Sequence, residues 1–218
     1  MARVLVLVEG ESEESFVQDI LAPALWPRGV YAIPIGLNGR TNYPRVKGDA
    51  LRILKQDRGV YCSTMLDLFR LGRGYPGTPL PENIPGLEKV RRVERAIADD
   101  LLDAIPELRP DVRFIPHLQL HEYEALLFSD PEVLAEAIGQ TRLAARFRTI
   151  RDDFATPEDM NDGPDTAPSK RVLALYPSYS KVIDGTLAAQ AIGIARMRKE
   201  CPHFRDWLER LEALAPVG

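Results

Sequence analysis

The stretch Arg3–Val8, RVLVLV, followed by Glu9–Glu13, EGESE, decides the fold of this chain. Its first part is an almost continuous apolar run without alternation, which is typical of a strand buried on both faces of a parallel sheet. Gly10 allows a tight exit from the strand, and Ser12 is expected to cap a helix whose first turn holds Glu13. The stretch therefore predicts a central strand that ends in carboxylates and leads into a helix.

Apolar runs and helical patterns continue to alternate up to about residue 140. Pro34 favours an edge position for the next strand, and Asp130-Pro131 is typical of a helix start. The expected strands are 30–35, 60–67 and 112–120, and the expected helices include 46–54 and 87–105. This order predicts an α/β fold with a mostly parallel central sheet and helices on both faces.

The character of the sequence changes beyond about residue 140. We expect residues 1–140 to form the α/β core and residues 141–218 a mainly helical extension packed on that core. Arginines gather on the first helix expected there, where they could follow a phosphate backbone. Such a run is more often a solvated helix face. These arginines are Arg142, Arg146, Arg148 and Arg151.

The bulk properties are those of an ordinary soluble domain. The 218 residues are 45% hydrophobic and 28% charged, and the net charge of -4 gives no global basic excess that would indicate nucleic acid. Local patches and metal ions can still hold phosphates. Since no apolar run reaches about 18 residues and the N-terminal run is too short for a signal peptide, we expect a cytoplasmic protein without a membrane span.

Cysteines and histidines indicate no metal motif by their spacing. Cys62 and Cys201 lie far apart and form no CxxC pair, so we interpret both as buried thiols. His117, His121 and His203 show no zinc spacing.

Carboxylates follow three of the expected strands. Glu9 and Asp67 end buried runs, and Glu122 follows the last strand. A carboxylate at the end of a buried strand must find a partner or a metal ion, and the carboxyl ends of parallel strands meet at one edge. Glu13 can point back to this edge, although it could simply serve the helix dipole. Glu122 could likewise be a solvated charge. Oxygen ligands of this kind suit Mg²⁺ or Mn²⁺.

Basic residues near these carboxylates could receive a polyanion. Arg70 and Arg73 follow Asp67 in a long loop rich in glycine and proline, and such loops are usually functional or mobile. In the polar segment 161–171, Lys170 with Arg171 could contact a phosphate, although turn chemistry and a helix start explain the same residues. His121 adjoins Glu122 and could act there or be structural.

Several segments resemble a known family. Residues 8–13, VEGESE, resemble the opening motif of the Toprim fold, which serves topoisomerases, bacterial primases and OLD-family nucleases, and the form VEG-x-[ST]-E is similar to the OLD-type branch. Segments 8–15, 63–67, 121–128 and 161–171 together are similar to a family of small bacterial Toprim-like proteins. The resemblance covers most of the chain.

The resemblance implies roles for individual residues. Glu9 matches the Toprim glutamate that acts as general acid/base or metal ligand, Glu13 matches the second acidic position of the OLD-type motif, and Asp67 matches the first aspartate of DxD. Phe69 stands where the second aspartate would be, which weakens two-metal catalysis. Lys170 loosely resembles the late lysine that stabilises transition-state charge in OLD-type nucleases.

A later acidic residue could compensate for Phe69. Both Glu122 and Glu124 are available, but in a helical segment only one of the two would face the site, and we expect Glu122. The expected metal ligands are therefore Glu9, Glu13, Asp67 and Glu122. The expected catalytic residues are Glu9, Asp67 and Lys170, and the expected nucleic-acid contacts are Arg70, Arg73, Lys170 and Arg171.

The leading hypothesis is a Mg²⁺- or Mn²⁺-dependent, Toprim-type nuclease-like protein that hydrolyses phosphodiesters of DNA or RNA. The resemblance also implies a partner ATPase of the ABC or AAA type, encoded nearby in a defence or repair module; the chain itself has no GxxxxGK[ST] motif. The alternative is a noncatalytic adaptor that binds its ATPase or nucleic acid, and a third hypothesis is phosphoryl chemistry on a small molecule. A homodimer remains open.

Overall fold

The computed structural model of the chain describes residues 1–72, 74–160 and 166–216. It confirms the α/β fold with a mostly parallel sheet. The strand order is β2-β1-β3-β4, and β5 also pairs with β3; every pairing is parallel. The strands are β1 (Ala2–Val8), β2 (Val30–Gly36), β3 (Val60–Asp67), β4 (Phe114–Ile115) and β5 (Leu118–Gln119).

The apolar run near the N-terminus forms a central strand that is covered on both faces. Val4, Val6 and Val8 of β1 belong to one hydrophobic cluster, and Leu7 belongs to another. β1 lies between β2 and β3, while β2 with Pro34 lies at the end of the strand order. This arrangement is the one expected from an unalternating run and from a proline that cannot donate to a ladder.

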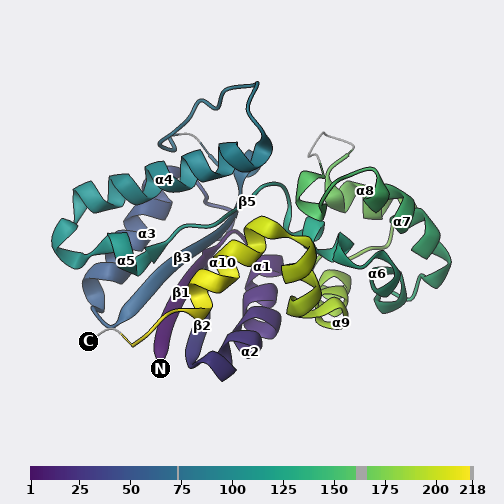
Figure 1. Ribbon diagram of the computed structural model, residues 1–218, viewed down its shortest axis with the longest axis horizontal. Helices are drawn as coiled ribbons and strands as arrows, with labels where there is room; N and C mark the ends of the chain where they lie inside the picture. The colour runs from purple at the N-terminus through teal and green to yellow at the C-terminus, as the bar shows by residue number, and fades with distance from the viewer. Residues whose placement is uncertain (73, 161–165, 217–218) are drawn as a thin grey trace.

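The helices cover the sheet in two layers (Figure 1). α3 and α4 lie on one side, and α1, α2 and α10 on the other, while α6 to α9 gather beside them. Their bounds are α1 (Glu11–Phe16), α2 (Ala22–Leu25), α3 (Tyr43–Gln56), α4 (Gly86–Ala104), α5 (Pro110–Arg113), α6 (Pro131–Ala137), α7 (Ala144–Asp152), α8 (Pro168–Leu175), α9 (Ile183–Glu200) and α10 (Pro202–Glu212). A π-helical turn, Val17–Leu21, joins α1 to α2, and short 3-10 turns include Leu68–Arg70, Pro106–Leu108 and Tyr123–Ser129.

The first helix begins earlier than expected. Gly10, not Ser12, is the N-cap of α1, and the backbone N–H of Gly10 donates to Glu13 Oε2 at 3.1 Å. The prediction placed the cap at Ser12 because serine caps helices through its side chain. Here the Glu13 carboxylate reaches back to the cap instead. The helix start at Asp130 is as expected, with Asp130 Oδ1 accepting from the Val133 N–H.

The expected strand 112–120 is broken. Residues 110–113 form α5, and β4 and β5 are separated at Pro116 and His117. Pro116 has no N–H for the ladder. In place of the ladder, Thr64 Oγ1 donates to the His117 carbonyl at 2.8 Å and accepts from the His117 N–H at 3.0 Å. The break therefore costs no unpaired backbone group at His117.

The C-terminal helices share the core of the sheet. One hydrophobic cluster contains Val4 of β1, Phe16 of α1 and Trp207 of α10. Trp207 Nε1 donates to Ser63 Oγ on β3 at 3.0 Å, and Ser63 Oγ donates to the Ile115 carbonyl at 2.6 Å. Within the described residues, no helix is both long and apolar enough to cross a membrane.

Arg113 ties three segments together from inside the protein. Its guanidinium donates to the carbonyls of Val60, Leu54, Leu108 and Asp57 at 2.6–3.3 Å, although its side chain is buried. These carbonyls belong to the start of β3, the end of α3 and the turn before α5. The arginine thus satisfies backbone acceptors that would otherwise lack partners.

We predict that Arg113→Met lowers the free energy of unfolding by about 3 kcal/mol, because several buried carbonyls lose a charged donor. Urea denaturation measures this change. Arg58→Met, at an exposed position of the same region, is the control and is expected to stay within about 0.5 kcal/mol of the parent. Equal effects of the two substitutions would contradict the role assigned to Arg113.

Candidate functional site

The candidate site lies where β1 and β3 end. Val8 is level with Met65 in the parallel pairing, so Glu9 and Asp67 leave the sheet at the same edge. Glu13 stands in the first turn of α1, directly after Glu9. The charges of Glu9 and Glu13 both act on Asp67, which is itself buried. The fold therefore brings these three predicted carboxylates to one edge.

Glu122 is the best-bonded carboxylate of the group. It follows β5 and is almost fully buried. Its Oε2 accepts the Ser169 N–H at 2.9 Å, and its Oε1 lies 2.6 Å from Arg70 Nη2 and 3.1 Å from Lys181 Nζ. Burial alone would raise the pKa of Glu122, but these donors outweigh burial and hold it below its ordinary value.

Glu124 joins the same group. Its Oε1 lies 3.0 Å from Lys181 Nζ, so one ammonium contacts both Glu122 and Glu124. The expectation that only one of the two glutamates faces the site assumed a helical segment. Glu122 instead has an extended backbone before the 3-10 turn Tyr123–Ser129, which lets both side chains reach Lys181.

The other carboxylates hold protons more tightly than usual. Burial raises the pKa of Glu13 to about 7, with further repulsion from Glu124 and Glu9. Burial, followed by the charges of Glu13, Glu9 and Glu124, raises the pKa of Asp67 well above its ordinary value. Burial also raises the pKa values of Glu9 and Glu124, against the pull of Lys181. Burial, with a smaller contribution from mutual repulsion, therefore makes these carboxyls costly to ionise without a nearby cation.

A pocket of about 140 Å³ opens onto this edge, lined by Asp67, Phe69, Arg70, His121, Glu122 and Ala167. Phe69 is 46% exposed, and its ring stacks on His121, with centroids 5.3 Å apart and planes 11° apart. Arg70 also lies 3.8 Å from Asp67, measured from Nε to Oδ2. The pocket therefore combines buried acids, a guanidinium and a partly exposed aromatic face.

The donor set suits a hard cation. Glu9 Oε2 is buried and has no hydrogen-bond partner among the described residues, and a buried carboxylate oxygen needs a compensating charge. No three of these carboxylates have oxygens within 4.8 Å of one another in the described residues. Mg²⁺ binds through one or two carboxylates together with water and substrate phosphate, so this spacing is compatible with it.

Lys181 is a site residue that the sequence analysis missed. It stands in a polar stretch before α9, distant in sequence from the glutamates it contacts, and no motif marks it. Close packing helps to place it. A Cβ on Gly185 of α9 would fall 2.8 Å from Tyr123 Oη and 2.9 Å from Tyr179 Oη. Glycine there lets the start of α9 approach the turn that carries Glu124.

The predicted basic residues Lys170 and Arg171 lie on α8, directly after Ser169. Lys170 is exposed on α8. Arg171 Nε donates to the Thr166 carbonyl at 2.7 Å, and its guanidinium lies 5.0 Å from the Phe154 ring centroid. Arg73 and residues 161–165 lie outside the described residues.

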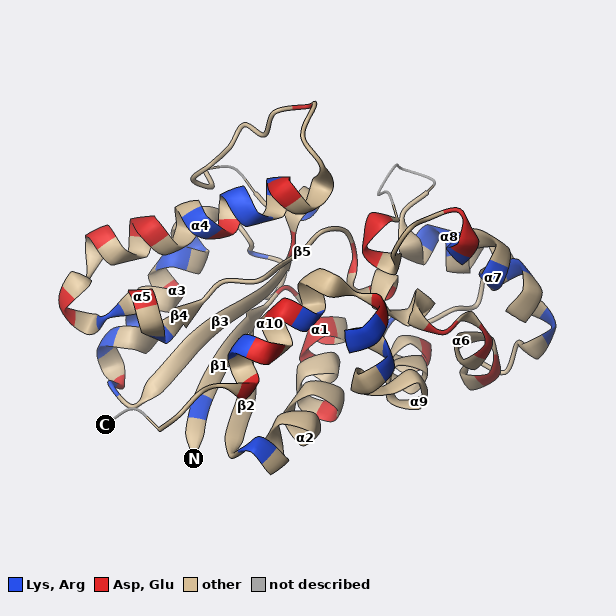
Figure 2. Ribbon diagram, viewed as in Figure 1, with Lys and Arg blue, Asp and Glu red and all other residues tan. Residues whose placement is uncertain are grey.

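The arginines beyond residue 140 are partly engaged in the structure. Arg148 pairs with Glu132, and Arg151 Nη1 donates to the Phe154 carbonyl at 2.7 Å. Along α4, Lys89, Arg91, Arg92 and Arg95 lie in the first half and Asp99, Asp100 and Asp103 near the end, so residues of both signs mark the helix (Figure 2). These contacts agree with the interpretation of such runs as solvated helix faces.

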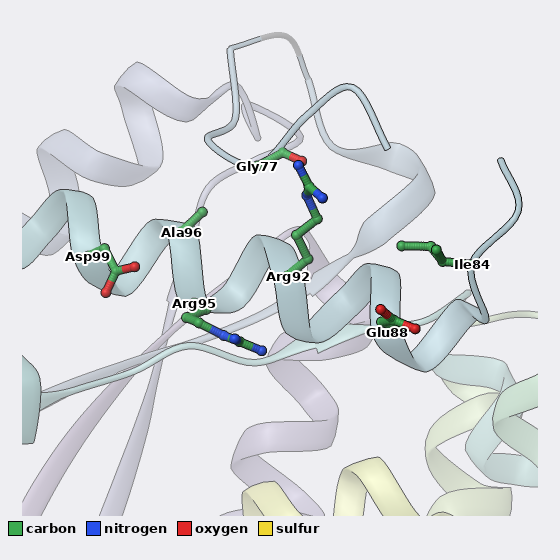
Figure 3. A pocket seen from close by; sticks show the side chains of 7 residues that line it. All are labelled: Gly77, Ile84, Glu88, Arg92, Arg95, Ala96 and Asp99. Carbon is green, nitrogen blue, oxygen red and sulfur yellow. The ribbon is translucent and has the colours of Figure 1, made fainter. Parts of the chain in front are cut away.

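A larger hollow of about 430 Å³ lies along α4 and the loop before it (Figure 3). Arg92 reaches across it and donates to the Gly77 carbonyl at 3.2 Å, while Glu88 and Asp99 line the same hollow from α4. Charges of both signs therefore meet solvent there. Because this hollow lacks the buried carboxylates of the sheet edge, the sheet edge is the stronger candidate site.

Comparisons with known proteins give a family and a set of similar structures. The family model described as "Domain of unknown function (DUF4276)" matches residues 8–212. A search of curated proteins finds no match. The chain is similar to the C-terminal region of the OLD protein of Xanthomonas campestris pv. campestris. The structure phased with iodine has 15% identity, a TM-score of 0.46 and coverage of 97% of this chain and 95% of that chain. The structure phased with mercury has 17% identity, a TM-score of 0.38 and coverage of 96% and 97%.

We predict that Glu13→Gln flattens the dependence of stability on pH in the absence of divalent ions. The folded-state pKa of about 7 lies above the ordinary value of 4.5, so the parent loses stability as pH rises through this window. The variant should gain about 2–3 kcal/mol relative to the parent between pH 4.5 and 8. Chemical denaturation at a series of pH values measures the gain.

Glu11→Gln on the same helix is the matched control, because Glu11 is exposed. It is expected to shift stability by less than about 0.5 kcal/mol at every pH. If the stability difference between Glu13→Gln and the parent is constant across this pH range, the pKa of Glu13 is not raised in the folded protein.

Proposed function

The chain belongs to the DUF4276 family, and we propose that it is a Mg²⁺- or Mn²⁺-dependent nuclease-like protein that acts on the phosphodiesters of nucleic acid. One observation carries the proposal. Glu9, Glu13, Asp67, Glu122 and Glu124 gather at the carboxyl ends of parallel strands, where Arg70 and Lys181 are the cationic side chains that contact them among the described residues. Ligands in such sheets bind at this edge. The Toprim relation belongs to the same proposal and rests on the VEGESE motif.

Of Glu9, Glu13, Asp67 and Glu122, one or two carboxylates would hold an ion directly, and the others would bind it through water molecules. The bound ion would neutralise phosphate charge and lower the pKa of a water molecule. The buried, unpartnered Glu9 Oε2 and the raised pKa values of Glu13 and Asp67 support this assignment, since each marks negative charge that the described residues leave uncompensated.

Glu9 is the proposed general base. Burial raises its pKa, which moves the carboxylate toward the range in which it can accept a proton from an attacking water molecule at neutral pH. Its Oε2 makes no hydrogen bond with the described residues, so this oxygen would accept the proton of the water when the ion is held by the neighbouring carboxylates. Asp67, at the end of the neighbouring strand β3, helps to position Arg70 through their contact.

Arg70 and Lys181 are the proposed phosphate-binding groups. Both now compensate Glu122, at 2.6 and 3.1 Å, and a cation among the carboxylates would release them to bind substrate oxygens. Lys181 thus takes the charge-stabilising role that the resemblance gave to Lys170. Lys170 and Arg171 of α8, with Arg73, are proposed to contact the flanking nucleic-acid backbone.

The aromatic rim supports nucleic acid over a small phosphate ester as the substrate. Phe69 replaces an acidic residue of the family pattern, yet its exposed ring lies on His121 at the pocket. Exposed aromatic faces stack on nucleobases irrespective of sequence. We therefore propose that a base of a single-stranded segment stacks on Phe69 while its phosphate meets Arg70.

A second candidate function is a noncatalytic adaptor. Phe69 in place of the second aspartate favours it, as does the absence, among described residues, of three edge carboxylates within 4.8 Å of one another. The adaptor would bind nucleic acid or an ABC- or AAA-type ATPase encoded nearby. This partner, in a defence or repair module, rests on the family resemblance alone.

We predict that Glu9→Gln reduces Mn²⁺- or Mg²⁺-dependent cleavage of DNA or RNA by 100-fold or more, because removal of a general base commonly costs about 10²–10⁴ in rate. Gel assays with labelled single- and double-stranded substrates measure cleavage, and circular dichroism checks the fold. Glu136→Gln, exposed on α6, should cleave like the parent. Absence of parent cleavage with either ion, even with the ATPase present, would favour the adaptor.

Lys181→Met should lower cleavage about 100-fold, since it removes a half-buried ammonium that contacts two carboxylates of the site. Lys170→Met, a matched change at an exposed lysine, should weaken substrate binding a few-fold and leave the turnover rate near that of the parent. Single-turnover kinetics separate the two effects. A larger rate loss in Lys170→Met would return the catalytic role to Lys170.

A further inference from the structure

A second cluster of metal-ligating side chains lies outside the acidic edge, which is the group formed by Glu9, Glu13, Asp67, Glu122 and Glu124. Glu94 comes from α4, His117 from the break between β4 and β5, and His203 from the start of α10. One ligand atom from each lies within 4.8 Å of the others. His203 Nε2 is 3.0 Å from Glu94 Oε1, and His117 Nδ1 is 3.9 Å from the same oxygen. The cluster shares no residue with the acidic edge.

The cluster is buried and incompletely satisfied. His117 is 0% exposed, His203 5% and Glu94 8%. The Gln119 Oε1 lies 2.9 Å from His117 Nε2 and can only accept, so Nε2 carries the ring hydrogen and Nδ1 presents a lone pair. That Nδ1 is buried without a hydrogen-bond partner among the described residues. A nitrogen lone pair thus faces a carboxylate oxygen, and only a proton or a cation between them makes the arrangement favourable.

Surrounding contacts fix the three side chains in place. The Leu118 N–H donates to Glu94 Oε1 at 2.8 Å, and the Trp207 ring stacks on His117 with centroids 4.3 Å apart. Glu158 accepts the His203 N–H at 2.9 Å at the start of α10. Gln119 also sets the tautomer of His117. Hydrogen bonds of this kind orient ligands around protein-bound metal ions.

We propose that Glu94, His117 and His203 bind a divalent transition-metal ion of the zinc class. Two imidazoles and one carboxylate are a known zinc donor set, and imidazole selects such ions over Mg²⁺. Ligand atoms at about 2.0–2.1 Å from a tetrahedral ion stand about 3.3 Å apart, and the two measured separations from Glu94 Oε1, 3.0 and 3.9 Å, lie on either side of that value.

The position of the cluster indicates what the ion would do. It would join α4, the strand break and α10, which are distant in sequence and meet only in the folded protein. A pocket lined by Glu94, Pro116 and Arg210 brings solvent up to Glu94, one of the three ligands. The sequence spacing of the histidines does not indicate this site, because its three ligands come from three separate elements. The ion would therefore stabilise the native packing of α10.

The test uses the full chain, stripped of metal with a chelator and titrated with Zn²⁺ by calorimetry. We expect one Zn²⁺ per chain at the cluster, a rise of several degrees in the thermal midpoint, and retention of the ion in excess Mg²⁺. Substitution of Co²⁺ should give the intense visible bands of a low-symmetry site with nitrogen ligands. Absence of both stoichiometric Zn²⁺ binding and these bands in the parent overturns the proposal.

Glu94→Gln and His117→Gln should each abolish the rise in thermal midpoint and weaken Zn²⁺ binding at least 100-fold. Glu88→Gln, an exposed change on the same helix, should bind Zn²⁺ like the parent. Undiminished binding in folded Glu94→Gln and His117→Gln would overturn the assignment. If either variant fails to fold, the Co²⁺ spectrum of the parent decides, because ligation by two imidazoles distinguishes this cluster from the acidic edge, whose expected ligands are carboxylates.

Discussion

The burial of β1 on both faces is the constraint on which the rest of the structure depends. Val4, Val6 and Val8 pack toward one hydrophobic cluster and Leu7 toward the other, so no charged side chain fits the middle of this strand. After Arg3 at its start, the strand can next carry charge only at its carboxyl end. Parallel pairing with β3 then brings Glu9 and Asp67 to the same edge. The chemistry of the site is thus a consequence of how the core is built.

The carboxylate charges of the acidic edge are compensated only in part by the neighbouring basic side chains. Arg70 and Lys181 both contact Glu122, whose pKa is held low, whereas Glu13, Asp67, Glu9 and Glu124 have raised pKa values. The raised pKa values favour protonated carboxyls, so bound protons offset part of the negative charge that a cation would otherwise offset. A group of carboxylates in this condition releases protons when a divalent ion binds, which couples ion affinity to pH. This electrostatic imbalance, more than any single distance, supports a site for a cation and a phosphate.

The sequence was most informative where local patterns determine local structure. Residues 60–67 were predicted as a strand ending at Asp67, and β3 has those bounds, because a buried β-prone run ends at a charged residue. The sequence was least informative where side chains meet across the fold. Lys181 has no motif, the cap at Gly10 depends on the reach of Glu13, and the extended backbone at Glu122 decides where Glu124 points. Each of these depends on tertiary contacts that periodicity does not encode.

The break between β4 and β5 affects two parts of the structure, the histidine cluster and the acidic edge. Pro116 interrupts the ladder, and Thr64 replaces the lost pairing by bonding both backbone groups of His117. The break leaves the His117 side chain between Glu94 and Trp207. Pairing then resumes at β5, level with Leu66 and Asp67, so the chain leaves the sheet beside Asp67 and delivers Glu122 to the acidic edge. A continuous strand would have offered no such turn of the backbone at His117. The same proline therefore accounts for the histidine cluster and for the path that brings the last carboxylates to the site.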